Sequence, residues 1–129
     1  MSYKYGFEKL DVWQDSRLFV KEIYTITKLY PNEERFNLCS QIQRASVSIV
    51  SNLAEGLSRN SGKEKIRFIE IAYGSLMEVY CQLQISVDLS YITNEQSEVL
   101  KLSIDKIANK LNALNRSIKN RSIVESVNR

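Results

Sequence analysis

The chain has 129 residues, of which 43% are apolar, so it can bury one hydrophobic core as a single domain. Four glycines and one proline are too few for the many turns of a β-sandwich or barrel, and they favour long helices. The absence of histidine excludes Ser-His-Asp triads, histidine-ligated zinc or haem, and the Glu-x-x-His di-iron bundle. The net charge of +3 is uneven, because residues 101–129 carry seven basic and two acidic side chains. Such a segment either attracts phosphate groups or is a solvated helix face.

The N-terminus and the cysteines indicate the compartment. The first ten residues are polar and aromatic, and no apolar run approaches the roughly 20 residues of a membrane span. We therefore expect a cytoplasmic protein with neither a signal peptide nor a membrane contact. Cys39 and Cys81 each lie in an apolar stretch, which favours two buried free thiols over a disulfide.

Hydrophobic periodicity predicts two helices in the first half of the chain. The first spans residues 11–30, with Asp11 as its N-cap and Gln14 as the capping-box partner, and Pro31 ends it. The second spans residues 33–57, with Asn32 as its N-cap. Its apolar stripe consists of Leu38, Ile42, Ala45, Ile49 and Leu53.

Two further helices are predicted in the second half, each behind a capping box. Ser61 and Glu64 open a helix over residues 62–90, and Thr93 and Gln96 open a helix over residues 94–119. The stripe of the third helix contains Ile66, Ile69, Tyr73, Leu76, Tyr80, Leu83 and Val87. That of the fourth contains Leu100, Ile104, Ile107, Leu111, Leu114 and Ile118.

Together these segments predict an all-α fold, an up-down-up-down antiparallel four-helix bundle over residues 11–119. Residues 1–10 form an N-terminal segment, and residues 120–129 form a polar, frayed tail. Breaks at residues 31, 60–62 and 93–94 are too frequent for one long coiled coil.

A line of polar residues runs beside the apolar stripe of the second helix, at steps of three or four. Its members are Gln41, Arg44, Ser48, Asn52, Glu55 and Arg59. This line is either a solvent-exposed face with intrahelical pairs or a polar seam, buried in the bundle or between subunits, that fixes the helix register. On the third helix, Gly74 and Ser75 lie opposite residues 45–46 of the hairpin, which predicts a close backbone approach. The same register predicts an ion pair between Arg44 and Glu78.

No pattern in the chain is typical of an enzyme. Glu55, Glu70 and Glu78 are a weak metal signal without histidine, and neither cysteine has a histidine to activate it. The glycines match no phosphate-binding loop. We therefore expect no catalytic residue, no metal and no cofactor.

Basic side chains gather at the turn between the second and third helices, and others follow the fourth helix. At a helix start, such groups can bind phosphates together with free backbone N–H groups. The zinc-finger, RRM and KH patterns are absent, so binding would depend on phosphate contacts and on salt. The candidate nucleic-acid contacts are Arg59, Lys63, Lys65, Arg67, Lys101, Lys106 and Lys110.

The aromatic content is large for one small bundle. Trp13, Phe19, Phe36, Phe68 and seven tyrosines exceed what the core positions of four helices hold easily. This excess predicts that part of the set lies in a subunit interface.

Two runs of sequence resemble a known family. Residues 7–14 look like its N-terminal signature, and residues 41–49, continuing to residues 52–56, look like its central one. Phe68, Gly74, Ser75 and Glu78 complete the pattern. Over about residues 5–115 the chain resembles the four-helix-bundle proteins encoded in intervening sequences of 23S rRNA genes, the S23 ribosomal protein-like family. The resemblance implies an up-down four-helix bundle, a homopentamer and no known catalytic activity.

The resemblance leaves two functions open. A related branch, the accessory variability proteins of diversity-generating retroelements, resembles this family in fold and pentamer. Its members bind a reverse transcriptase and nucleic acid through a basic surface. By analogy, this chain is an oligomer that associates with RNA, DNA or a nucleic-acid enzyme through basic surfaces. The alternative is a structural or adaptor oligomer with no nucleic-acid role.

Overall fold

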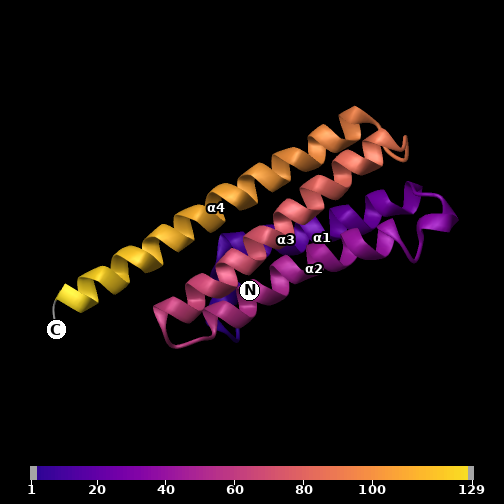
Figure 1. Cartoon of the computed structure of the whole chain (residues 1–129). Coiled ribbons are helices and arrows are strands. Elements are labelled where there is room, and N and C mark those ends of the chain that lie inside the picture. Colours follow the sequence, from indigo (N-terminus) through magenta and orange to yellow (C-terminus); the bar gives the residue numbers. More distant parts are fainter. Residues whose placement is uncertain (1–2, 128–129) are drawn as a thin grey trace.

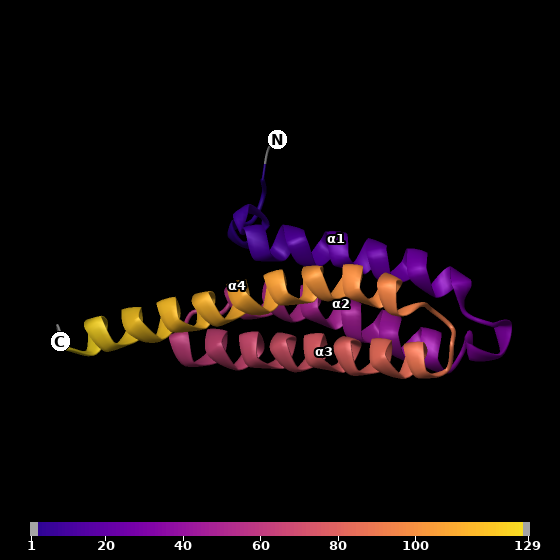
Figure 2. The same ribbon diagram turned by 90° about the horizontal axis from the view of Figure 1, so that it is seen from above.

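The computed structural model describes residues 3–127 and consists almost entirely of four long helices. They are α1 (Asp11–Ile26), α2 (Leu38–Leu57), α3 (Gly62–Asp88) and α4 (Asn94–Val127). Successive helices run in opposite directions, and α4 returns to pack against α1 (Figures 1 and 2). The predicted all-α, up-down-up-down bundle is therefore confirmed, and no strand occurs within residues 3–127. No helix in that part of the chain is long and apolar enough to cross a membrane.

The core follows the predicted stripes on α2 and α4 and departs from the predicted stripe on α3. The whole predicted stripe of α2 is buried, and Ile104, Ile107 and Leu111 of α4 are buried as well. On α3 the core takes Val79, while the predicted Tyr80 is exposed beside the ammonium group of Lys101. Both positions satisfy steps of three and four between Leu76 and Leu83, so periodicity could not separate them.

The N-cap half of the Ser61–Glu64 box at the start of α3 and the complete Thr93–Gln96 box at the start of α4 are confirmed. The Oγ of Ser61 accepts a hydrogen bond from the backbone N–H of Glu64 at 3.1 Å. The Thr93 N–H donates to Oε1 of Gln96 at 2.8 Å, and the Gln96 N–H donates to Oγ1 of Thr93 at 3.1 Å. Each box satisfies backbone donors that a helix start leaves unpaired.

The predicted cap of the first helix and the predicted start of the second are wrong, although α1 begins at residue 11 as predicted. Asp11 is the first residue of α1 rather than its cap, and the amide of Gln14 donates to the Glu8 carbonyl at 2.9 Å. α2 begins at Leu38 instead of residue 33, after a short 3₁₀ turn, η3 (Asn32–Glu34). Asn37 has a non-helical ψ of −102°, and Leu38 is the first residue after it that faces the core. Burial of the apolar stripe, rather than the acidic pair at residues 33–34, therefore decides where α2 begins.

The predicted ends of α1 and α4 also differ from the structure. α1 ends at Ile26, and a 3₁₀ turn, η2 (Thr27–Leu29), follows it; the Thr27 hydroxyl donates to the Ile23 carbonyl at 2.9 Å. α4 continues to Val127, so residues 120–127 are helical and not a frayed tail. No glycine or proline lies beyond residue 74, and an unbroken helix propagates at little cost past its last core contact. Residues 128–129 lie outside the described part of the chain.

A segment at the N-terminus packs on the bundle. Residues 6–9 form a 3₁₀ turn, η1 (Gly6–Lys9), which contacts α1 and α2. The Glu8 carboxylate accepts a hydrogen bond from the Tyr5 backbone N–H at 2.9 Å. Phe7 meets the ring of Trp13 edge-on, with their centroids 5.0 Å apart. Residues 1–2 of the predicted segment are outside the described residues.

The close approach between α2 and α3 occurs at Gly56 and not at Gly74. A Cβ placed on Gly56 would lie 2.4 Å from the Cβ of Phe68, which is closer than two carbon atoms can pack. A Cβ placed on Gly74 would meet nothing within 4 Å, so the predicted role of Gly74 in the hairpin is wrong. The two helices therefore touch near their connecting turn, where little chain separates them.

The two glycines form a matched pair for mutation. We expect Gly56→Ala to lower the free energy of unfolding by about 1–2 kcal/mol, because overpacking outweighs the gain of about 1 kcal/mol in helix propensity. Gly74→Ala gains the same propensity with no clash and should raise that free energy by about 0.5–1 kcal/mol. Urea unfolding followed by circular dichroism measures both. An unchanged or more stable Gly56→Ala variant would contradict the close approach.

Candidate nucleic-acid interface

The predicted polar line on α2 is divided into a paired centre and exposed ends. At the centre, the hydroxyls of Ser48 and Ser75 are 2.8 Å apart and join α2 to α3. Asn52 donates from Nδ2 to the Ser48 carbonyl at 2.8 Å and to its Oγ at 2.9 Å. These three side chains are half-buried, so the seam interpretation describes this part of the line.

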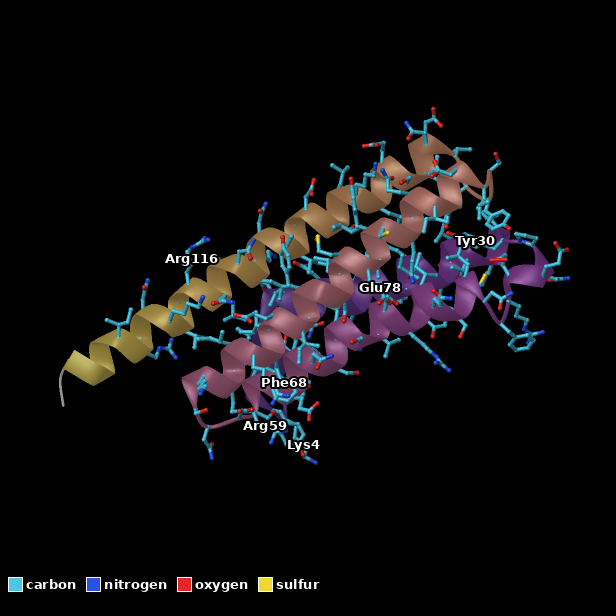
Figure 3. All side chains as sticks on the ribbon, in the orientation of Figure 1. Lys4, Tyr30, Arg59, Phe68, Glu78 and Arg116 are labelled. Carbon is cyan, nitrogen blue, oxygen red and sulfur yellow. The ribbon has the colours of Figure 1, made fainter. Side chains whose placement is uncertain are left out.

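The ends of the line do not form the predicted seam. Arg44 and Glu78 are both exposed, and no ion pair joins them. Ser75 contacts α2, and Glu78 is exposed where α3 borders α2 (Figure 3). Glu55 forms an intrahelical pair with Arg59 at 3.1 Å, as the solvent-face interpretation predicted.

A hollow of about 440 Å³ separates Arg44 from Glu78 on the α2–α3 surface. Gln82 forms part of its wall and is 7% exposed, and its Nε2 donates to Oε1 of Gln41 at 3.4 Å. The Cys81 thiol is exposed there, so the expectation of two buried thiols is wrong for this cysteine. Cys39 is buried, and burial, with the nearby Glu34 carboxylate, raises the pKa of its thiol. Both cysteines are free, as predicted.

Four candidate nucleic-acid contacts lie at the turn that joins α2 to α3. The Arg59 guanidinium is 5.1 Å from the centre of the Phe68 ring, and that of Arg67 is 5.9 Å from it. Arg59 is also paired with Glu55, and Arg67 lies 4.0 Å from Glu64. Lys63 is exposed and Lys65 half-buried, and neither forms an ion pair with a described carboxylate. These two lysines are the candidates most available to phosphate.

The other three candidates, on α4, are engaged in contacts within the chain. Lys106 and Lys110 bind the Asp15 carboxylate at 3.5 and 2.6 Å, and so connect α4 to α1. Lys101 binds Glu98 at 3.1 Å and lies over the Tyr80 ring. These lysines therefore stabilise the packing of α4, and they lie apart from the α2–α3 turn.

Three exposed basic residues near the end of α4 are absent from the predicted site. Arg116, Lys119 and Arg121 are exposed toward the C-terminal end of α4, and this part of α4 lies at the same end of the bundle as the α2–α3 turn (Figure 1). The sequence signal for these three residues was the excess of basic over acidic side chains in residues 101–129. The expected helix end at residue 119 concealed that all three lie on one helix. We call these three residues, together with Arg59, Lys63, Lys65 and Arg67, the basic end.

The site residues offer no arrangement typical of catalysis. Within residues 3–127, no group of three cysteine or carboxylate side chains could hold a metal ion. The structure offers instead cationic side chains, the start of α3 and one arginine-flanked ring, which are groups that contact phosphates and bases.

Because the Arg44 and Glu78 side chains are exposed and unpaired, a double-mutant cycle should find little coupling between them. Arg44→Ala and Glu78→Ala should each change the free energy of unfolding by less than about 0.5 kcal/mol, and the double variant should be additive within about that error. Asp15→Ala and Lys110→Ala are the matched comparison, with an expected coupling of about 1 kcal/mol. Coupling of that size between Arg44 and Glu78 would contradict the exposed, unpaired geometry.

Comparisons with known proteins agree with this fold. The chain matches the family of 23S rRNA-intervening sequence proteins over residues 8–113. It is similar to a solved structure from Bacteroides thetaiotaomicron, described as a protein with unknown function from the S23 ribosomal protein family. The TM-score is 0.74 at 28% identity, over 81% of this chain and 97% of that one. No curated protein matches the chain. Because the match covers both signature runs and most of the bundle, the chain belongs to the 23S rRNA-intervening sequence protein family.

Proposed function

We propose that the chain is a non-enzymatic subunit of a homo-oligomer, a pentamer, that associates with nucleic acid through its basic end. The observation that supports this function is that two segments far apart in the sequence lie at the same end of the bundle. Residues 59–67 and residues 116–121 each supply at least three basic side chains, and the fold brings them to one end of the bundle. The partner is RNA or DNA, or an enzyme bound to either, because clustered cations attract phosphate backbones.

The start of α3 adds to the attraction of the basic end. Its first backbone N–H groups carry the positive end of the helix dipole, and Ser61 caps one of them through the bond to Glu64. Lys63 and Lys65 follow directly and are not neutralised by a described carboxylate. Contacts of this kind recognise phosphate and not base sequence, so the proposed binding is general and sensitive to salt.

A structural or adaptor oligomer with no nucleic-acid role remains the second candidate function. It is favoured by the pairing of five of the seven predicted contacts with carboxylates of the same chain. Paired cations offer less attraction to phosphate than free ones. The binding experiment described next separates the two functions.

The basic end predicts how nucleic-acid binding depends on salt. We expect Lys63→Gln, Lys65→Gln and Arg67→Gln together to weaken binding of a single-stranded RNA to a similar extent for all sequences. The slope of log K against log salt should fall by about 2, because each phosphate contact contributes about 0.7 for single strands. Fluorescence anisotropy at several salt concentrations measures both effects.

The control for that experiment is Arg44→Gln. Arg44 is an exposed arginine of α2 that pairs with no described carboxylate, and it lies about four helical turns from Arg59. Its replacement should leave the slope unchanged. Absence of RNA and DNA binding at low salt would eliminate the proposed nucleic-acid role and leave the adaptor function.

The proposed oligomer needs a surface that one chain leaves uncovered. An apolar groove of about 500 Å³ runs between α1 and α4, and it is lined by Leu18, which is 58% exposed, and Val99, which is 61% exposed. Leu102 lies further along α4 and is 71% exposed. The aromatic residues expected at an interface are divided, since Phe19 is fully buried in the core and Phe36 is exposed. Aliphatic side chains of α1 and α4 are therefore the main support for this interface.

Replacement of the groove residues should dissociate the oligomer. We expect a mass near five times 14.9 kDa for the native chain in light scattering. Val99→Lys with Leu18→Lys should give a folded monomer, because charges cannot be buried unpaired in an apolar contact. Leu29→Lys, at an exposed leucine outside the groove, is the control and should keep the native mass. A monomeric native chain at micromolar concentration would exclude the oligomer.

A further inference from the structure

A second hollow lies at the end of the bundle opposite to the basic end. It has a volume of about 520 Å³ and is bounded by the end of α1, the turn through Pro31 and the start of α2. Tyr30, which forms part of its wall, marks this end in Figure 3, far from Arg59. This volume lies within the range of small-molecule sites. None of the predicted site residues lines it.

Aromatic rings are prominent in the wall of this end hollow. Phe36 is 82% exposed, the highest value among the large apolar side chains that the structure describes, and the Arg35 guanidinium lies 5.3 Å from its ring centre. Tyr24 adds a second exposed ring from α1. The Tyr30 ring is buried and is held by a hydrogen bond of 2.6 Å from its hydroxyl to Oγ of Ser86. The hollow therefore has a fixed wall and an exposed ring on which a flat ligand can stack.

Two basic and no acidic side chains line the end hollow. Lys28 and Arg35 line it without a carboxylate, and neither forms an ion pair with a described residue. Glu33 and Glu34 are in the same turn but do not line the hollow. They lie near Tyr91, and burial together with the charges of Glu34 and Glu33 raises the pKa of that phenol. The two cations are therefore available to an anionic group.

One polar side chain of the hollow can form a hydrogen bond with the edge of a bound base. The Nε2 of Gln43 donates to Oγ1 of Thr27 at 3.0 Å, and this bond fixes the amide in the wall of the hollow. No described residue donates a hydrogen bond to Oε1 of Gln43. Because an amide oxygen accepts two hydrogen bonds, it can accept from an N–H of a planar base.

We propose that the end hollow binds a nucleotide, either free or as one unit of single-stranded RNA. The base stacks on Phe36 and beside the Arg35 guanidinium, and the phosphate binds Lys28 and Arg35. An apolar ligand would leave the two cations without a partner, and inorganic phosphate would leave the exposed ring uncovered. This site is independent of the proposed basic end, because it lies at the other end of the bundle and shares no residue with it.

Titration calorimetry of the full chain with adenosine and uridine monophosphates tests the site, with inorganic phosphate as the reference ligand. We expect nucleotides to bind at least tenfold more tightly than phosphate, because base stacking on one ring contributes about that factor. Phe36→Ala should remove this tenfold advantage, and Phe36→Leu, which keeps an apolar side chain without a ring, should remove most of it. Lys28→Gln should weaken nucleotide and phosphate alike.

Two controls separate this site from other surfaces. Tyr5→Ala removes an exposed ring far from the hollow and should leave nucleotide affinity unchanged. The triple variant Lys63→Gln, Lys65→Gln and Arg67→Gln should also bind mononucleotides normally, even if it loses the salt-dependent RNA binding of the basic end. Because Phe36 is exposed, its variants should keep the native melting temperature, which circular dichroism verifies.

Titration of the triple variant with a ten-nucleotide oligouridylate distinguishes a free nucleotide from one unit of single-stranded RNA as the ligand. Binding of both the oligomer and the free nucleotide, each sensitive to Phe36→Ala, supports a site for either source. Phe36-dependent binding of the oligomer alone assigns the hollow to single-stranded RNA. Equal affinity for phosphate and nucleotides, no effect of Phe36→Ala, or no binding of any of these ligands at millimolar concentration would overturn the proposal.

Discussion

The close contact between α2 and α3 at Gly56 and Phe68 is the constraint on which the arrangement of the basic residues at the α2–α3 turn depends. Without a side chain at Gly56, the Phe68 ring can lie against the end of α2. That position lets Arg59 and Arg67, from opposite sides of the turn, approach the same ring. A wider separation of the helices would move these guanidinium groups apart. The packing of one glycine against one ring thus sets the spacing of charges on the surface.

The sequence predicted the features that depend on local patterns. The four helices, the stripe of α2 and the boxes at Ser61 and Thr93 were all evident, because each involves residues within one or two turns. The predicted cap at Asp11 and the predicted start of α2 at residue 33 are wrong, because Leu10 precedes α1 and tertiary packing decides where α2 begins. The burial of Val79 in place of Tyr80 could not be decided either, since both fit the same alternation of steps.

The candidate site was predictable only in part, because its pairings connect helices that are distant in sequence. Lys106 and Lys110 look like free cations in the sequence, but the fold places Asp15 of α1 between them. The register estimate that predicts the Arg44–Glu78 pair places Ser75 opposite residues 45–46, whereas Ser75 contacts Ser48, so the estimate is displaced by about one helical turn. Arg44 and Glu78 line the same hollow between α2 and α3, but both are exposed and no ion pair joins them. Surface ion pairs are also weak, so nothing compels exposed charges to meet.

The location of the apolar groove and of the basic end makes their proposed uses compatible. The groove lies between the C-terminal half of α1 and the start of α4, in the half of the bundle that holds the end hollow, whereas the basic end is at the opposite end. A contact between subunits that covers this groove leaves the basic end open to other partners. Each subunit added to such an oligomer also adds one basic end, and several weak phosphate contacts on one assembly raise its affinity for a long strand far above that of one subunit. The modest net charge of +3 on one chain is therefore no measure of the attraction that an oligomer exerts.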